Sequence, residues 1–396
     1  MSNYFTKFFL FLILIFNNYV VKKDYNSLVQ RKYSYNTSNI KNINISTLYE
    51  FMNITKFKNK ILFFEPNYHH HECIPGFTKY FIDLGYDVDI LLTSNGIDSL
   101  SLFRQINKLR LFTFKNLNQI KNNSQILSSI IKKYCFVILG STDWDKEDIY
   151  NELDLFKINN SILVNHDTRF YGIKLHNFYN QNRMWVLGNL SEGLFVNPHY
   201  FGDIQLIDKN IEKTRFFITS SFSRNYTDLL KACDKLKKEN FVFEIIVTGR
   251  YDVLNRTIIS KNLTDNFIFK LNSNYSELYK SVIKSDYIIA ILDPNIEYDK
   301  GYMEYRVSGS IQLSYGFLKP IIIHQGFSKF YFLNSRNSLL FNDSNIYDIM
   351  KKSILLTKKE YRKLQKKLYQ TKKTVYKTSF NNVKNIYLPK KYLKII

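Results

Sequence analysis

The residues best suited to chemistry in this chain of 396 residues lie between Glu297 and Ser310. Glu297 and Glu304 lie in a stretch that we expect to be a polar loop. Each of their carboxylates can accept two hydrogen bonds from ligand hydroxyl groups. The alternative is that they are two solvated loop acids. The run Ser308-Gly309-Ser310 follows them and is typical of a helix start, where Ser308 would cap the first turn. Backbone N–H groups at a helix N-terminus attract anions such as phosphate. The stretch therefore predicts a site for an anionic ligand that carries hydroxyl groups.

Two buried strands and a helix must position these residues. The run from Tyr287 to Leu292 is nearly all apolar and is closed by Asp-Pro, which indicates a parallel strand buried on both faces. The helix that starts near Gly309 should end before Pro320, because proline cannot extend a helix. Ile321 to Ile323 then forms the next strand. In a strand–helix–strand unit of this kind, anionic ligands bind at the helix N-terminus, beyond the carboxyl end of the strand.

Two arginines follow predicted strands upstream of this unit. Arg224 comes after the apolar run Phe216 to Thr219, and Arg250 comes after Phe243 to Val247. Fixed cations and helix N-terminal amides can bind a phosphate group without a metal. The alternative is that both arginines are solvated loop residues.

Histidines occur at two further loops. His69, His70 and His71 precede Glu72, but consecutive side chains in an extended loop point apart, so a metal site is disfavoured. We expect one histidine, with His71 as the candidate, or Glu72 to line a cleft. His166-Asp167 follows the predicted strand Ser161 to Val164. The alternatives are surface histidines without a role and a loop histidine that caps a turn.

Two blocks of the chain resemble a known family. The first block resembles the nucleotide-sugar half of GT-B glycosyltransferases of the group 1 type. It consists of the acidic pair, the small-residue helix start and Gly-Phe-x-Lys-Pro-Ile-Ile-Ile from Gly316. Six residues separate the two glutamates, where the family usually has seven. The strand–loop–helix–Leu-Gly-Tyr–strand run from Lys60 to Leu92 resembles the opening of the acceptor domain of these enzymes. The resemblance covers about residues 58 to 345.

The resemblance implies an α/β fold of two Rossmann-like domains with doubly wound parallel sheets. It implies transfer of a sugar, usually with retention of configuration, from a nucleotide-sugar donor to a hydroxyl of a glycan or lipid-linked acceptor. No metal and no other cofactor are expected. The implied catalytic residues are His166, Glu304 and His71. The implied substrate-binding residues are Arg224, Arg250, Glu297, Ser308, Gly309, Ser310, Glu72 and Gly76.

The alternation of strands and helices independently indicates parallel sheets. We divide the chain into a hydrophobic anchor or signal segment, a linker, an acceptor-side domain, a nucleotide-sugar-binding domain and a basic helical segment. Their bounds are 1–23, 24–57, 58–205, 206–345 and 346–396.

Positive charge is concentrated at the end of the chain. The net charge is +22, and fifteen basic residues against the single acid Glu360 place +14 of it in the last 46 residues. A nucleic-acid enzyme would more often interleave basic residues with its site, so a nucleic-acid partner is disfavoured. A basic tail is more typical of a solvated helix face or of contact with an anionic membrane surface.

The N-terminal segment favours membrane association. Phe8 to Phe16 is an apolar run of nine residues, whereas a membrane-spanning helix needs about 20. Lys22 and Lys23 follow it, which favours cytosolic catalytic domains. The three widely spaced cysteines fit a reducing compartment. A lumenal enzyme with a single-pass anchor is the alternative.

Two other functions fit the same sequence. A GT-B-like scaffold without catalysis could act as a basic membrane-binding or nucleic-acid-binding protein, because a fold does not determine function. An α/β epimerase of related architecture would need no acceptor.

Overall fold

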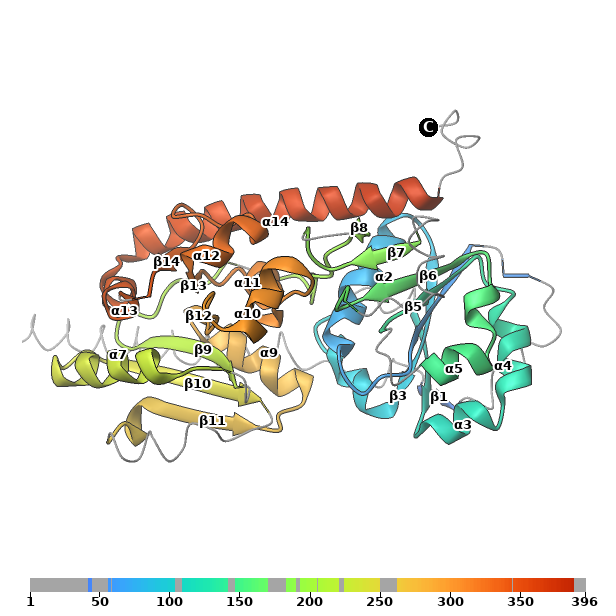
Figure 1. The fold of residues 1–396 in the computed structure, drawn as a ribbon, viewed down its shortest axis with the longest axis horizontal. Helices are drawn as coiled ribbons and strands as arrows, with labels where there is room; N and C mark the ends of the chain where they lie inside the picture. Colours follow the sequence, from blue (N-terminus) through green and yellow to red (C-terminus); the bar gives the residue numbers. More distant parts are fainter. Residues whose placement is uncertain are drawn as a thin grey trace, which may run out of the picture. The chain divides into compact units, whose positions relative to one another are not determined.

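The computed structural model describes residues 42–44, 56–57, 59–103, 109–141, 147–169, 183–189, 193–204, 206–220, 224–249, 262–343 and 345–387. The predicted segment 1–23 lies outside the described residues, as does Arg250. Within them the strands form two sheets, coloured blue to green and yellow to orange in Figure 1, and every strand pair is parallel. The predicted α/β architecture with two Rossmann-like sheets is confirmed.

The first sheet has eight strands in the order β1-β4-β3-β2-β5-β6-β7-β8. They are β1 (Asn42–Asn44), β2 (Lys60–Glu65), β3 (Asp87–Thr93), β4 (Leu109–Phe114), β5 (Phe136–Leu139), β6 (Ser161–Asn165), β7 (Met184–Val186) and β8 (Leu194–Phe195). The chain winds from β2 out to β4, returns to β5 beside β2, and then winds the other way. The winding direction therefore reverses between β2 and β5. Strand β1 lies within the stretch predicted to be a linker.

Both faces of this sheet are covered. Ile61 and Phe63 pack with helix α2 (Ile74–Asp83) on one face, whereas Leu62 and Phe64 pack with helix α4 (Ser124–Ile131) on the other, because successive strand residues point to opposite faces. The remaining helical elements of this part are η3 (His71–Cys73), η4 (Ser94–Leu100), α3 (Leu117–Lys121), α5 (Glu147–Glu152) and η7 (Leu155–Lys157).

The second sheet has six strands in the order β11-β10-β9-β12-β13-β14. They are β9 (Thr214–Ser220), β10 (Phe243–Gly249), β11 (Phe267–Leu271), β12 (Tyr287–Ala290), β13 (Ile321–His324) and β14 (Leu339–Phe341). Here the winding direction reverses between β9 and β12. Each sheet thus has one switch point, and the loops at its carboxyl edge form the usual ligand site of such folds.

Helices also cover both faces of the second sheet. Helices α7 (Thr227–Lys238) and α13 (Ile346–Leu355) share one core with β9, β10 and β12. On the other face, Tyr279 and Phe317 pack around the ring of Phe201. They belong to α9 (Tyr275–Lys284) and α11 (Gly309–Phe317). The other elements are η8 (Thr264–Asn266), α10 (Glu297–Glu304), α12 (Gln325–Ser328) and η9 (Lys329–Tyr331).

Helix α10 replaces a predicted loop. The stretch from Glu297 to Glu304 is polar, which suggested irregular structure, but acidic residues in its first turn favour a helix N-terminus. The Nζ of Lys300 also lies 2.8 Å from Oε2 of Glu297, an i,i+3 pair that stabilises a helix. Glu297 and Glu304, both predicted to lie in a loop, are therefore helical residues.

Helix α14 (Lys358–Tyr387), red in Figure 1, contacts the cores of both sheets. Near its start, the Tyr361 hydroxyl donates to the carbonyl of Asp286, 2.7 Å away, within the core of the second sheet. Near its end, Val383 is buried in the core of the first sheet, and Nδ2 of Asn382 donates to the carbonyl of Phe195 at 2.8 Å. No helix in the described part of the chain is both long and apolar enough to cross a membrane.

Candidate active site

A cavity of about 360 Å³ lies where the carboxyl edges of the two sheets meet. The first sheet and its loops contribute His70, Glu72, Cys73, His166, Asp167 and Leu187. The second contributes Tyr298, Tyr302, Arg306, Val307, Gly309 and Gln312. The cavity thus combines histidines and carboxylates from one sheet with a cation and a helix N-terminus from the other.

His166 is held as a neutral hydrogen-bonding group. Its Nε2 lies 3.2 Å from the carbonyl oxygen of Gly140, which can only accept, so Nε2 carries the proton and Nδ1 is left as an acceptor. Burial, and then the neighbouring His70, lower the pKa of His166 to about 3. The rings of His70 and His166 stack with centroids 4.1 Å apart. This predicted residue does line the cavity.

Glu72 connects the two halves of the cavity. Its Oε1 lies 3.5 Å from Nδ1 of His70, and its Oε2 accepts a hydrogen bond of 3.0 Å from the hydroxyl of Tyr275 on α9. Burial opposes ionisation, but the hydrogen bond and charge of His70 lower the pKa of the Glu72 carboxyl to about 2. The carboxylate is therefore ionised at neutral pH and can orient the His70 ring.

His71 and Gly76 are placed differently from the prediction. The His71 side chain is buried, with Nε2 3.2 Å from Oγ1 of Thr93, and burial lowers its pKa to about 4. His70 adopts the left-handed conformation (φ 65°) immediately before η3, and this turn sends His70 rather than His71 to the cavity. Gly76 lies so close to Pro198 that any side chain there would collide with the Pro198 backbone. It serves packing and does not line the cavity.

Arg306 supplies the positive charge of the cavity. Its guanidinium lies over the rings of Tyr298 and Tyr302, with centroid distances of 3.8 and 4.4 Å. The Arg306 side chain also donates to the backbone carbonyl of Tyr298, and its buried Nε has no hydrogen-bond partner among the described residues. Asp167 pairs with Arg306 through a backbone bridge. Such an ordered cation is suited to bind an anionic group.

The N-terminus of α11 opens into the same cavity. Gly309 is exposed, and a side chain added there would meet nothing within 4 Å. One turn later Gln312 is only 3% exposed, and its Nε2 has no partner in the part of the chain that the structure describes. A buried amide without a partner costs free energy, so a bound ligand that accepts from it would recover this cost.

The two serines beside Gly309 do not line the cavity. Ser308 occupies the N-cap position, but its side chain makes no capping hydrogen bond, so the predicted cap is wrong. Ser308 is buried, and its carbonyl accepts from the N–H of Ile311 at 3.0 Å. The Ser310 hydroxyl lies 3.3 Å from Oγ1 of Thr219.

Arg224 sits at the switch point of the second sheet. It forms an ion pair with Asp299, and its guanidinium lies 4.8 Å from the centroid of the Tyr302 ring. Burial raises the pKa of Asp299, whereas the charge of Arg224 lowers it. Arg224 is thus paired with Asp299 close to the cavity, but Arg224 is not one of the lining residues.

Glu297 and Glu304 point away from the cavity. The Glu297 side chain is 89% exposed and Glu304 is also exposed, because residues seven apart share one helix face, here the outer one. The inward face of the same stretch carries Asp299, Tyr302 and Arg306. Asp299 and Tyr302 have the i, i+3 spacing of one helix face, a signal in the sequence that could have identified them, whereas Arg306 lies past the helix end at Glu304.

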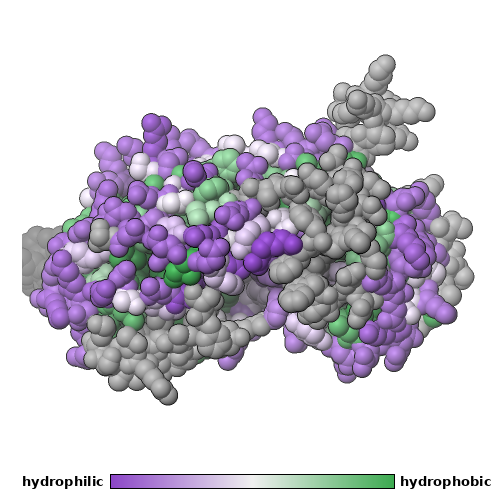
Figure 2. All heavy atoms as spheres, viewed as in Figure 1, coloured by the Kyte–Doolittle hydropathy of each residue, from purple (hydrophilic) through white to green (hydrophobic). Residues whose placement is uncertain are grey.

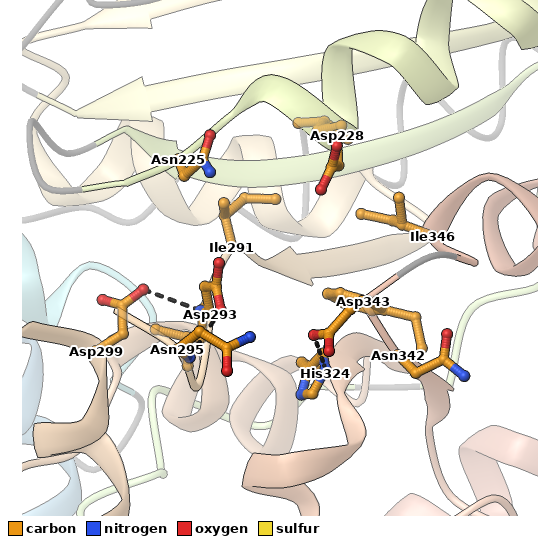
Figure 3. A pocket seen from close by; sticks show the side chains of 13 residues that line it. Asn225, Asp228, Ile291, Asp293, Asn295, Asp299, His324, Asn342, Asp343 and Ile346 are labelled. Atoms are coloured by element: carbon orange, nitrogen blue, oxygen red, sulfur yellow. Dashed lines mark hydrogen bonds and ion pairs between the residues drawn. The ribbon is translucent and has the colours of Figure 1, made fainter. Parts of the chain in front are cut away.

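A second cavity, of about 110 Å³, lies beyond the ends of β12, β13 and β14 (Figure 3). His324 Nε2 lies 2.9 Å from Oδ1 of Asp343 at this site. The four carboxylates around it belong to Asp228, Asp293, Asp299 and Asp343. The 360 Å³ cavity combines Arg306 with a helix N-terminus and has more room, so it suits an anionic ligand better than this smaller cavity. Among the described residues, no group of three or more His, Cys, Asp or Glu is arranged to hold a metal ion.

Comparison with known proteins identifies the fold. No protein-family model and no curated protein matches the chain. Among solved structures, HepE from Anabaena, in complex with UDP and glucose, is similar over 83% of this chain and 100% of its own, with a TM-score of 0.52 and 14% identity. The chain has the GT-B fold.

Two further structures have the same GT-B fold. A glycosyltransferase from Rickettsia africae matches with a TM-score of 0.52 and 16% identity, covering 86% of this chain and 100% of that one. An alpha-glucosyltransferase in complex with UDP-glucose and DNA matches with a TM-score of 0.54 and 10% identity, covering 82% and 99%. The predicted GT-B architecture is confirmed, but a fold does not by itself determine an activity.

Proposed function

We propose that this chain is a glycosyltransferase that moves a hexosyl or related sugar from a nucleotide-sugar donor to a hydroxyl acceptor. The supporting observation is the 360 Å³ cavity. It is lined by His70 and His166 from loops of the first sheet, and by Arg306 and the α11 N-terminus from the second. HepE and the alpha-glucosyltransferase are in complex with UDP or UDP-glucose, so a uridine diphosphate sugar is the first donor to test.

The donor diphosphate would bind at the second sheet. The N-terminus of α11 carries about half a positive charge, and its first N–H groups, at Gly309 and Ser310, have no partner within the helix. Arg306 adds a full charge on the same cavity wall. Together they can stabilise the departing diphosphate, so the proposed reaction requires no metal. The Gln312 amide would donate to a further oxygen of the donor.

The sugar and the acceptor hydroxyl would lie against the first sheet. Because Nε2 of His166 carries the proton, its Nδ1 can accept a hydrogen bond from a sugar hydroxyl. The His70 ring, oriented by Glu72, can accept one from the acceptor. We propose retention of configuration, as the family resemblance implies. Anomeric ¹H NMR of the product tests this point separately.

Thermal-shift and calorimetric titration with UDP-, GDP-, ADP- and CMP-sugars would test the proposal. A donor at 100 times its Kd stabilises the fold by about 2.7 kcal/mol, which gives a measurable rise in Tm. One donor class should bind, and Arg306→Ala should weaken its binding. Failure of every donor to bind would refute the proposal. Binding without transfer or hydrolysis would instead support a scaffold without catalysis, and a changed donor sugar without an acceptor would indicate an epimerase.

A further inference from the structure

A basic groove lies between α13 and the first turns of α14. Its volume is about 530 Å³, and its walls carry Arg336, Lys352, Lys363 and Lys367. Leu339, Leu356 and Leu364 form its apolar part. The one acidic residue of the groove, Glu360, already accepts from the N–H of Thr357 at 2.9 Å. The groove therefore combines four cations with an apolar surface, which suits an anionic amphiphile.

The outer face of α14 continues this positive charge. Tyr361, Gln365 and Leu368 are buried against the protein, so the lysines at 359, 363, 366 and 367 lie on the opposite, exposed face. In the described part of the chain, none of these four lysines forms an ion pair. Figure 2 shows mostly hydrophilic residues over α14, with a few hydrophobic ones between them.

Exposed apolar side chains accompany the lysines. Leu355, at the end of α13, is 62% exposed, and Tyr369 on α14 is 41% exposed. Leu206 is 45% exposed, and the chain just after it is held against this region by the ion pair of Asp208 with Arg362. Exposed large apolar residues among lysines are typical of a surface that lies on a membrane.

We propose that this face of α13 and α14 binds the surface of an anionic phospholipid membrane. Phospholipid headgroups would enter the basic groove, while the exposed Leu355 would reach the boundary of the acyl chains. Nucleic acid offers no partner for the exposed leucines, whereas a bilayer does. The inference does not depend on the proposed glycosyl transfer. It would place the two domains on a membrane with an anionic, and hence cytosolic, leaflet.

Vesicle co-sedimentation of the full chain tests this inference. The vesicles are phosphatidylcholine alone or with 30% phosphatidylglycerol. The variant K363Q/K366Q/K367Q removes three charges from the groove and the outer face. Each lysine at an anionic membrane surface contributes about fivefold in partitioning, so the variant should bind roughly 100-fold more weakly at low salt. Wild-type binding should also fall as salt rises.

The matched control is K115Q/K121Q/K157Q, which removes the same charge from exposed lysines of the first domain. It should bind anionic vesicles within about twofold of wild type, since membrane attraction falls off within a Debye length. Leu355→Asn should weaken binding even at high salt. Equal loss in both triple variants, or no loss in the groove variant, would overturn the inference. So would tighter binding of a duplex DNA 30-mer than of anionic vesicles.

Discussion

The ion pair of Arg224 with Asp299 allows a sharp test of how the second switch point is built. Only 1% of the Asp299 side chain and 11% of the Arg224 side chain are exposed. Arg224→Met keeps most of the stem over Tyr302 but leaves the carboxylate without its charged partner. Removing one partner of a buried pair costs about 3–5 kcal/mol of folding free energy. Asp299 keeps one hydrogen bond, from the N–H of Asp293 at 3.0 Å, so we expect the lower end, about 3 kcal/mol.

The double variant Arg224→Met/Asp299→Asn provides the comparison. The asparagine oxygen can still accept from the N–H of Asp293, and no buried charge remains. We therefore expect the double variant to be about 2 kcal/mol more stable than Arg224→Met alone. Urea unfolding followed by circular dichroism at pH 7 gives these differences directly.

The pH dependence supplies an independent check. Burial raises the pKa of Asp299, so the folded state binds its proton more readily than the unfolded state does. Stability contributed by protonation then rises as pH falls through that raised pKa. Arg224 lowers the pKa of Asp299, so the pKa should rise further when Arg224 is removed. As the pH falls from 7 to 4.5, Arg224→Met should therefore recover part of its lost folding stability. If Arg224→Met is no less stable than the double variant, or if its deficit is the same at both pH values, the buried-pair argument is wrong.

Three other predictions concern the 360 Å³ cavity and the buried His199. Arg306→Ala should weaken nucleotide-sugar binding by about 1.5–3 kcal/mol in calorimetry, because a charged hydrogen bond is lost; unchanged affinity would remove Arg306 from the donor site. Glu72→Gln should lower turnover more than donor affinity, because the carboxylate that orients His70 is lost. Glu297→Gln is the exposed control and should change neither quantity. Equal kinetics for the two variants would count against a role for Glu72 in orienting His70. Burial lowers the pKa of His199 to about 3, so the folded state binds this proton less readily than the unfolded state, and stability is lost as pH falls from about 6.5 toward 3. His199→Gln should therefore show a shallower loss of unfolding free energy between pH 7 and pH 5, and an identical slope would contradict it.

The sequence alone determined the fold, because the signals that specify it are local. The apolar runs in β2 and β12 are buried on both faces, as their composition predicts. Gly85 has the left-handed φ of 87° expected after a helix, and α11 ends before Pro320, which cannot continue it. Each of these features depends on residues within a few positions of one another. Local patterns likewise placed His166 after a strand, Glu72 in a loop and Gly309 at a helix start, and all three line the cavity.

Tertiary structure decided which neighbours of these residues face the cavity. The left-handed conformation of His70 places His70 rather than His71 in the cavity lining, and the sequence His-His-His holds no signal for that choice. The partner of Glu72 is Tyr275, 203 positions away, because the two sheets meet at their carboxyl edges. Arg306, two residues past the end of α10, lines the cavity, whereas Glu297 at the start of the helix lies in solvent. Contacts between distant segments depend on how the two sheets pack, and a local pattern of residue types does not specify that packing.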